Sequence, residues 1–196
     1  MENKTQIVFA THNLNKLKEV QSIVPNNIEI IGLDDIGCHE EIIENGKNLT
    51  ENAQIKADYV FKTYGKSCFA DDTGLEVDAL NGEPGVYSAR YAGANRSSEA
   101  NMEKLLNNLK GKTNRDAQFK TVIYYRTPTE TLFFEGICKG KILSAKQGEK
   151  GFGYDPIFKP NESEISFAEM PPQLKNEISH RGKAFLKFYS FLNKTE

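Results

Sequence analysis

Short apolar runs alternate with helical repeats along the first part of the chain. Gln6–Ala10 is an apolar run typical of a buried strand, and Ile28–Ile31 is a β-branched run of the same kind. Between them, before Pro25, apolar positions recur at helical spacing: Leu17, Val20, Ile23 and Val24. A strand, a helix and a strand in this order predict an α/β fold.

A second helix and a third strand follow an acidic loop, which we expect over Leu33–Lys47. Asn48 or Thr50 is a plausible N-cap for the helix, and Gly65 is well placed to end it. The apolar face of the helix is formed by Ala53, Ala57, Val60, Phe61 and Tyr64. Ser67–Ala70 then predicts a buried strand that ends at the sequence Asp-Asp-Thr-Gly.

The second half predicts a helix, a hairpin and a helical C-terminal segment. Ser97 or Ser98 can cap a helix that ends before Gly111 and buries Met102, Leu105, Leu106 and Leu109. Phe119–Tyr125 and Leu132–Cys138 predict an antiparallel hairpin. The remaining elements are a glycine-bearing loop at Gly148–Gly153, a short strand at Ile157-Phe158 and a helix with Phe185, Phe188 and Leu192 on one face. No linker divides the chain, so we expect one domain over residues 1–196 with a mixed sheet.

The C-terminal segment is predicted to form two helices rather than one. On one unbroken helix, Lys175 and Arg181 would be rotated about 120° from alignment and could not easily meet at one ligand. Ser179 is a good N-cap, and proline can start a separate helix before it. We therefore expect a helix over Pro172–Glu177, a break near Ser179 and a second helix to about Leu192.

Composition and charge exclude several classes of protein. The 196 residues contain 38% hydrophobic and 27% charged residues, and the net charge of -2 argues against a surface that binds a nucleic-acid polymer. The odd number of widely spaced cysteines, at Cys38, Cys68 and Cys138, indicates a reduced intracellular protein. No signal peptide or membrane-spanning stretch is evident, so we expect a soluble, cytoplasmic protein without membrane partners.

Two segments near the predicted strand ends carry candidate chemistry. Thr11–Lys16 joins the first strand to the first helix, where backbone N–H groups and a lysine can bind phosphate; the alternative is an ordinary turn in which Asn13 or Asn15 caps the helix. The adjacent carboxylates of Asp71 and Asp72 can hold a hard cation and take a proton from water; the alternative is a tight Asp-rich turn.

Three further groups add oxygen ligands, aromatic rings and cations. Glu40, Glu41 or Glu44 could complete a metal site with Asp72, or could simply lie in a solvated acidic loop. The segment Gly151–Pro156 places an aromatic residue between glycines, which would let a flat base stack on the ring. Donors for phosphate or for a base edge come from Lys175, His180 and Arg181. The alternative for these last two groups is a glycine turn and the polar side of a helix. Neither His12 nor His39 forms a zinc-binding pattern.

Together these segments resemble the Ham1/RdgB family of inosine and xanthosine triphosphate pyrophosphatases. The resemblance rests on four stretches in the order of the family: FATHNLNK, FADDTGLEVDALNGEPGVYSARYAG, GFGYDPIF and SHRGKA. It implies an elongated mixed β-sheet with flanking helices, in two lobes around a central substrate cleft, and a homodimer. It also implies that the enzyme hydrolyses ITP, dITP and XTP to the monophosphate and pyrophosphate with Mg²⁺.

The resemblance implies a role for each matched residue. Asp72 would be the general base and a metal ligand, with Glu44 as the second metal ligand, although Glu41 stays possible. Thr11, Asn13 and Lys16 would bind the triphosphate, and the other substrate-binding residues of this part would be His12, Leu14, Asn15 and Thr73. The base pocket would be formed by Phe152, Gly153, Tyr154, Asp155, Lys175, His180 and Arg181. His12 stands where many family members have glycine, so its own role stays open.

Two other functions are compatible with parts of the pattern. A Maf-like pyrophosphatase would act on pyrimidine or modified nucleotides, but the GFGYD and SHR segments favour the Ham1-like interpretation. A nucleotide sensor would bind without hydrolysis, but carboxylates that face a triphosphate would repel it unless a cation lies between them, which favours an enzyme.

Overall fold

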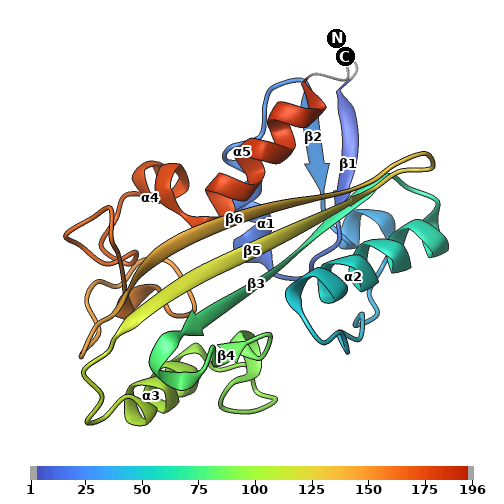
Figure 1. Ribbon diagram of the computed structural model, residues 1–196. Helices are drawn as coiled ribbons and strands as arrows, with labels where there is room; N and C mark the ends of the chain where they lie inside the picture. Colours follow the sequence, from blue (N-terminus) through green and yellow to red (C-terminus); the bar gives the residue numbers. More distant parts are fainter. Residues whose placement is uncertain (1–3, 194–196) are drawn as a thin grey trace. The chain divides into compact units, whose positions relative to one another are not determined.

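The computed structural model describes residues 4–193 (Figure 1). The α-helices are α1 (Leu14–Gln21), α2 (Leu49–Tyr64), α3 (Ser98–Asn108), α4 (Pro172–Ile178) and α5 (His180–Leu192). The strands are β1 (Thr5–Phe9), β2 (Ile28–Ile31), β3 (Cys68–Val77), β4 (Pro84–Gly85), β5 (Asp116–Arg126), β6 (Thr131–Ile142) and β7 (Phe158–Pro160). Short 3-10 turns occur at Asp34–Ile36, Asp78–Leu80, Ser88–Arg90 and Asp155–Ile157.

The strands form one mixed sheet in the order β2-β1-β3-β5-β6-β7, with β4 paired to β3. The strand β1 runs parallel to both β2 and β3, whereas β4 and β7 are antiparallel to their partners. The mixed α/β fold expected from the sequence is therefore confirmed. The chain divides into two compact units, and β3, β5 and β6 each contribute residues to both.

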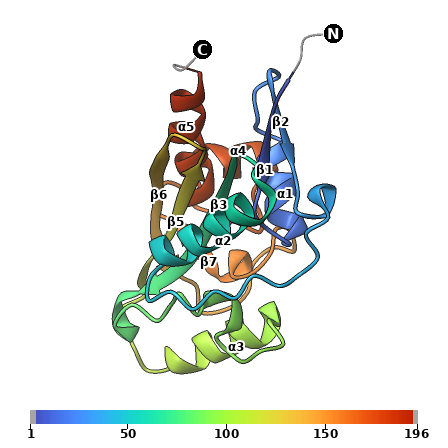
Figure 2. The same ribbon diagram turned by 90° about the vertical axis from the view of Figure 1, so that its right-hand side faces the viewer.

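The first unit contains the chain up to Asp72, Thr121–Glu135 and the chain from Ala184 onward. Its part of the sheet has a different helix layer on each face, because successive strand residues point to opposite sides. Ile7, Phe9 and Phe69 pack with residues of α1 and α5, whereas Val8, Cys68 and Ala70 pack against α2. Figure 2 shows α2 lying along the sheet in this unit. Whether a β3 side chain of this unit packs against α2 or against α1 and α5 therefore depends on the face of the sheet to which it points.

The second unit contains Thr73–Lys120 and Gly136–Lys183. Its core combines one face of α3 with the ends of β3, β5 and β6 and with the segment around β7, and its buried members include Leu75, Leu105, Phe119, Phe158 and Phe167. The single domain expected over residues 1–196 and the cleft between two lobes stay predictions, and residues 1–3 and 194–196 lie outside the described chain.

Most predicted elements agree with the structure, but several boundaries differ, and both hairpin strands are longer than expected. The strand β3 does not end at Ala70 but continues to Val77. The first helix ends at Gln21, so Ile23 and Val24 follow it rather than belong to it. Ile157 belongs to a 3-10 turn, and the short strand β7 begins one residue later than expected. Helical caps were predicted correctly at Asn48, Gly65 and Ser97.

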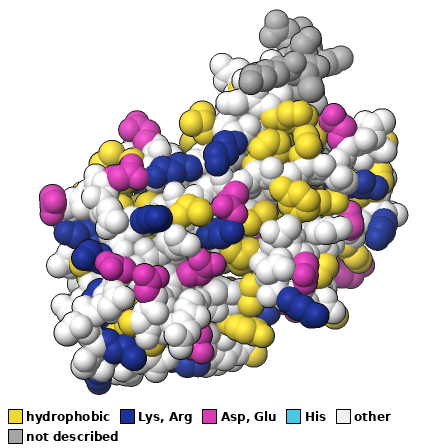
Figure 3. Space-filling model, in the orientation of Figure 1, with side chains coloured by type: hydrophobic (Ala, Val, Ile, Leu, Met, Phe, Trp, Pro, Cys, Tyr) yellow, Lys and Arg dark blue, Asp and Glu magenta, His cyan; other side chains and the backbone are white. Residues whose placement is uncertain are grey.

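One face of the molecule carries mixed charge (Figure 3). On the face drawn in Figure 3, acidic and basic side chains are interspersed, with no broad field of one sign. Within residues 4–193, no helix has the length and apolar character needed to cross a membrane.

Candidate functional site

The loop between β1 and α1 is organised around Asn13. The Asn13 side chain accepts hydrogen bonds from the backbone N–H groups of Asn15 at 3.0 Å and Lys16 at 3.2 Å, and the backbone N–H of Asn13 donates to Thr11 Oγ1 at 3.1 Å. Asn13 is therefore the N-cap of α1, as one sequence interpretation proposed. Leu14 is 61% exposed at this helix start. The other backbone N–H groups in the first turn of α1 lie at a helix N-terminus, a position that favours an anion.

Lys16 and His12 connect this loop to other segments of the first unit. Lys16 Nζ lies 2.8 Å from Asp71 Oδ1, and the Asp71 side chain is fully buried. The Nε2 atom of His12 lies 2.9 Å from the carbonyl oxygen of Glu40, so His12 holds the acidic loop beside the helix start. Lys16 thus neutralises a buried carboxylate beside the start of α1.

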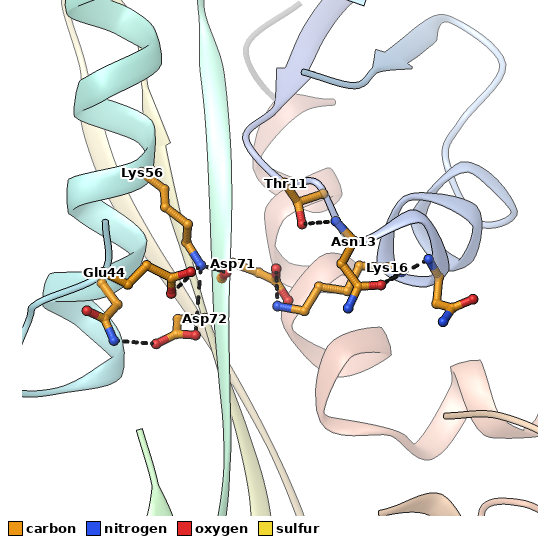
Figure 4. Close-up of polar contacts among 9 residues, drawn as sticks. Thr11, Asn13, Lys16, Glu44, Lys56, Asp71 and Asp72 are labelled. Carbon is orange, nitrogen blue, oxygen red and sulfur yellow. Dashed lines mark hydrogen bonds and ion pairs between the residues drawn. The ribbon is translucent and has the colours of Figure 1, made fainter. Parts of the chain in front are cut away.

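Asp71 and Asp72 lie inside β3, not in a turn or at a strand end. The adjacent strand β1 pairs with β3 only as far as Phe9 and Phe69, so both acids lie beyond the end of β1. Because neighbouring strand residues point to opposite faces, Asp71 is directed toward α1 and Asp72 toward α2 (Figure 4). The expectation that these two carboxylates jointly hold one cation is therefore wrong.

The buried ammonium of Lys56 on α2 joins the acidic groups on the other face of β3. Its Nζ donates to Glu44 Oε2 at 3.0 Å and to the Asp71 carbonyl oxygen at 2.8 Å, and it lies 3.8 Å from Asp72 Oδ1. Asn52 Nδ2 donates to the second oxygen of Asp72, Oδ2, at 3.0 Å. Glu44 and Asp72, from segments far apart in the sequence, thus converge on one point (Figure 4).

The protonation of Lys56 and Asp72 reflects this crowding. Burial alone would lower the pKa of the Lys56 ammonium, but attraction to Asp72 and then Glu44 and Asp71 raises it overall, so Lys56 stays charged. Burial raises the pKa of Asp72, and the nearby cations Lys56 and Lys16 hold part of that rise back. A carboxylate with a raised pKa is a stronger base toward water than an exposed one.

The donor atoms at this point suit a hard cation. Within the described residues no group of three or more His, Cys, Asp or Glu side chains could hold a metal ion. However, Mg²⁺ is commonly held by one or two carboxylates together with substrate phosphate oxygens and water. Glu44 and Asp72 supply two carboxylates that already flank a positive charge at 3.0 and 3.8 Å. These residues therefore fit Mg²⁺ better than zinc.

In the second unit, Asp155 organises the glycine-bearing loop. Its Oδ2 accepts hydrogen bonds from the backbone N–H of Phe152 at 2.8 Å and from Lys175 Nζ at 2.7 Å, and Asp155 is 4% exposed. Gly151 adopts φ +75°, and a Cβ atom there would overlap the Asp155 carboxylate. Asp155 thus fixes both the loop that carries Phe152 and the ammonium of Lys175.

Two cationic side chains that were predicted to line the base pocket lie against the ring of Phe152. Lys175 Nζ lies 5.2 Å and Arg181 Cζ lies 5.5 Å from the ring centroid. Phe152 is half-buried, whereas Lys175 and Arg181 are mostly buried. Cations at such distances from an aromatic ring are attracted by its electron-rich face. Lys175 and Arg181 therefore approach the same aromatic ring, and their convergence on a ligand together with His180 stays a prediction.

The break between α4 and α5 makes this approach possible. Helix α4 ends at Ile178, and Ser179 is extended (φ -70°, ψ 157°). The Oγ of Ser179 accepts from the N–H of Gly182 at 3.0 Å and caps α5. Gly182 lacks space for a Cβ because the carbonyl of Asn176 lies against it. The predicted break is confirmed.

Two predicted pocket residues pack into the core of the second unit. The Tyr154 hydroxyl donates to the Ser88 carbonyl at 2.8 Å, and burial raises the pKa of Tyr154 well above its ordinary value. The His180 ring stacks on Phe119 with 4.5 Å between centroids and is 4% exposed. Gly153 adopts φ +65°, which favours glycine, and Thr73 is partly exposed on β3.

Sequence reasoning missed Asn52 and Lys56. Both lie on the buried face of α2, 1% and 7% exposed, beside the buried residues Ala53 and Ala57. Their i, i+4 spacing next to small apolar residues could have indicated that both lie on the buried face of the helix. Polar side chains on such a face need hydrogen-bond or ion-pair partners, and this would have marked them as candidates.

Comparisons with known proteins show the family of this chain. A family model described as the Ham1 family matches residues 7–191. A protein of Christiangramia forsetii named dITP/XTP pyrophosphatase is 57% identical over 96% of this chain and 100% of its own length. A protein of Porphyromonas gingivalis with the same name is 48% identical over 95% of this chain and 97% of its own length.

Solved structures show the same fold. The Staphylococcus aureus Ham1 protein superimposes with a TM-score of 0.89 at 43% identity, covering 98% of this chain and 100% of that one. A nucleoside-triphosphatase, or dITP/XTP pyrophosphatase, from Mycobacterium abscessus superimposes with a TM-score of 0.77 at 39% identity, covering 94% and 98%.

Proposed function

Because this chain belongs to the Ham1 family, we propose that it hydrolyses purine nucleoside triphosphates with an abnormal base, namely ITP, dITP and XTP. The products would be the nucleoside monophosphate and pyrophosphate, as water adds across the bond between the α- and β-phosphates. The observation that carries this proposal is the convergence of Glu44 and Asp72 on one cationic position. The names of close relatives of nearly equal length support it.

The first unit would supply the groups that act on the phosphates. Glu44 and Asp72 would hold Mg²⁺, which when bound neutralises phosphate charge and lowers the barrier to attack. Lys16 and the N-terminus of α1, capped by Asn13, would bind phosphate oxygens. Asp72 would take the proton of the attacking water, a role that its raised pKa supports. Lys56 would hold the two carboxylates in place before the cation enters.

The second unit would supply the groups that recognise the base. Hypoxanthine and xanthine present a 6-keto acceptor where adenine presents an amino donor. Lys175, His180 and Arg181 are donors, so adenine would leave a buried donor facing a donor, at a cost of about 1–3 kcal/mol for each unpaired group. Phe152 would stack on the base, and Asp155 would orient Lys175 and the Phe152 backbone.

The test is pyrophosphate release from ITP, dITP, XTP, GTP, ATP and UTP with Mg²⁺. We expect release from the first three, with kcat/KM at least about tenfold above that for ATP, which corresponds to about 1.4 kcal/mol. Measuring free phosphate separately distinguishes cleavage at the α–β bond from cleavage at the β–γ bond. Turnover of UTP alone would favour a Maf-like enzyme, and tight ITP binding without any turnover would favour a nucleotide sensor. Either result would overturn the proposal.

We also propose a homodimer, on the basis of the family resemblance alone. Light scattering of the purified chain would give twice the monomer mass, and a monomer at all concentrations would contradict it.

A further inference from the structure

Asn52 connects two segments of the first unit through its side-chain amide. Its Nδ2 donates to Asp72 Oδ2 at 3.0 Å, and its Oδ1 accepts from the backbone N–H of Gly46 at 2.8 Å. The residue is 1% exposed. One buried amide therefore links the strand β3 to the loop that precedes α2.

The neighbours of this amide dictate its orientation. A backbone N–H can only donate, and an ionised carboxylate can only accept. The amide nitrogen must therefore face Asp72 and the amide oxygen must face Gly46. An aspartate at position 52 would keep the acceptor for Gly46 but lose the donor to Asp72, whereas an alanine would lose both.

The loop lies directly against Asn52 at Gly46. A Cβ atom at Gly46 would come within 2.7 Å of Asn52 Oδ1 and of Glu51 Cβ. Glu44 is two residues earlier, and its Oε2 lies 3.0 Å from Lys56 Nζ. The amide thus binds Asp72 directly and anchors the loop that carries Glu44.

We propose that Asn52 is a positioning residue that sets the spacing and orientation of the Glu44 and Asp72 carboxylates for a divalent cation. This inference rests on the proposed function, in which these two side chains hold Mg²⁺. A bond to Oδ2 of Asp72 leaves Oδ1 directed to the side of Lys56, where Glu44 also ends. Partners that orient metal ligands typically change metal affinity or activity about 10–100-fold when removed.

The test compares Asn52→Ala and Asn52→Asp with the control Asn101→Ala. Asn101 is also a buried helical asparagine, 3% exposed, whose amide accepts from Ala92 N at 2.6 Å and donates to the Ala89 carbonyl at 3.1 Å. It belongs to the second unit, whereas the candidate metal carboxylates belong to the first. The measurements are Mn²⁺ binding by electron paramagnetic resonance without nucleotide, kcat and KM at saturating Mg²⁺, and metal-free thermal unfolding.

We expect Asn52→Ala to unfold cooperatively but to bind Mn²⁺ about 10–100-fold more weakly than Asn101→Ala does. Asn52→Asp should lower kcat at least about tenfold with little change in KM, because the donor to Asp72 is lost. If Asn52 only anchors the loop, Asn52→Asp will retain the wild-type kcat, and the inference is overturned.

The remaining outcomes also decide the inference. If the wild-type protein hydrolyses no nucleotide, the proposed function fails, but weaker Mn²⁺ binding by Asn52→Ala still supports positioning. If the wild type hydrolyses ITP and Asn52→Ala binds Mn²⁺ as Asn101→Ala does, positioning is excluded while the function stands. Wild-type protein that binds no Mn²⁺, or loss of cooperative unfolding in both Asn52 variants, would also overturn it.

Discussion

Replacing Lys56 with methionine should lower the free energy of unfolding by about 3–5 kcal/mol at neutral pH, because it breaks a buried ion-pair network from one side. The Lys56 side chain is 9% exposed, and its ammonium contacts Glu44 at 3.0 Å and lies 3.8 Å from Asp72. Methionine has a similar length and apolar volume. The substitution therefore removes the charge and its hydrogen bonds while largely preserving the packing of the lysine stem.

The magnitude follows from the distances. At an effective dielectric constant of about 20, the Coulomb attraction is about 5–6 kcal/mol at the Glu44 distance and about 4 kcal/mol at the Asp72 distance. The lost hydration of the ammonium offsets most of this attraction, so the network as a whole contributes little. Removing the lysine alone leaves two carboxylates without this cation, and their uncompensated charge lowers the free energy of unfolding.

The loss should become smaller as the pH falls. Burial raises the pKa of Asp72 and Lys56 holds part of that rise back, so the variant should have a still higher Asp72 pKa. A carboxyl group whose folded-state pKa exceeds its unfolded value binds its proton more tightly when the protein is folded. The folded state therefore gains stability as the pH falls through that folded-state pKa. The variant should regain part of its lost stability in acid.

Urea unfolding followed by circular dichroism at about pH 8 and about pH 5 measures both effects. The control is Lys146→Met, since Lys146 lies 2.6 Å from Glu99 but the two side chains are 48% and 54% exposed. This exposed pair should contribute less than about 1 kcal/mol. Equal stability of the two variants, or a deficit in Lys56→Met that is the same at both pH values, would refute the reasoning.

Four further outcomes test the assigned chemistry. Asp72→Asn should reduce ITP turnover about 100-fold or more with the fold intact, whereas Asp116→Asn, on the surface, should not; near-wild-type turnover of Asp72→Asn would exclude Asp72 as the base. Excess EDTA should stop turnover and Mg²⁺ should restore it without added zinc, because the candidate ligands are oxygens; full activity in EDTA would eliminate the metal assignment. Phe152→Ala should raise KM for several bases by the equivalent of about 1–3 kcal/mol, since stacking tolerates different bases; an unchanged KM for ITP would identify Phe152 as core packing. Thiol reagents should label the native protein slowly, because burial raises the pKa of Cys68 to about 12 and that of Cys138 to about 11; rapid labelling of either would contradict their burial.

The sequence by itself determined the features that depend on neighbouring residues. The caps at Asn48 and Gly65 and the helix break at Ser179 were read correctly, because each involves atoms only a few residues apart. Short apolar runs and alternating patterns gave most strands, because a strand buried on both faces is apolar throughout, whereas one buried on a single face has apolar side chains at every second position. Four ordered motifs were also enough to identify the family, which the family model supports over residues 7–191.

Only the tertiary structure decided how the acidic residues are used. Whether Asp71 and Asp72 formed a turn or stayed extended depended on the neighbours of β3, which remains paired in the sheet after β1 has ended. That continuation sends Asp71 toward Lys16 and Asp72 toward Asn52 and Lys56. No local pattern contains this information, because the partners of each carboxylate are set by which distant segment packs on its face of the sheet.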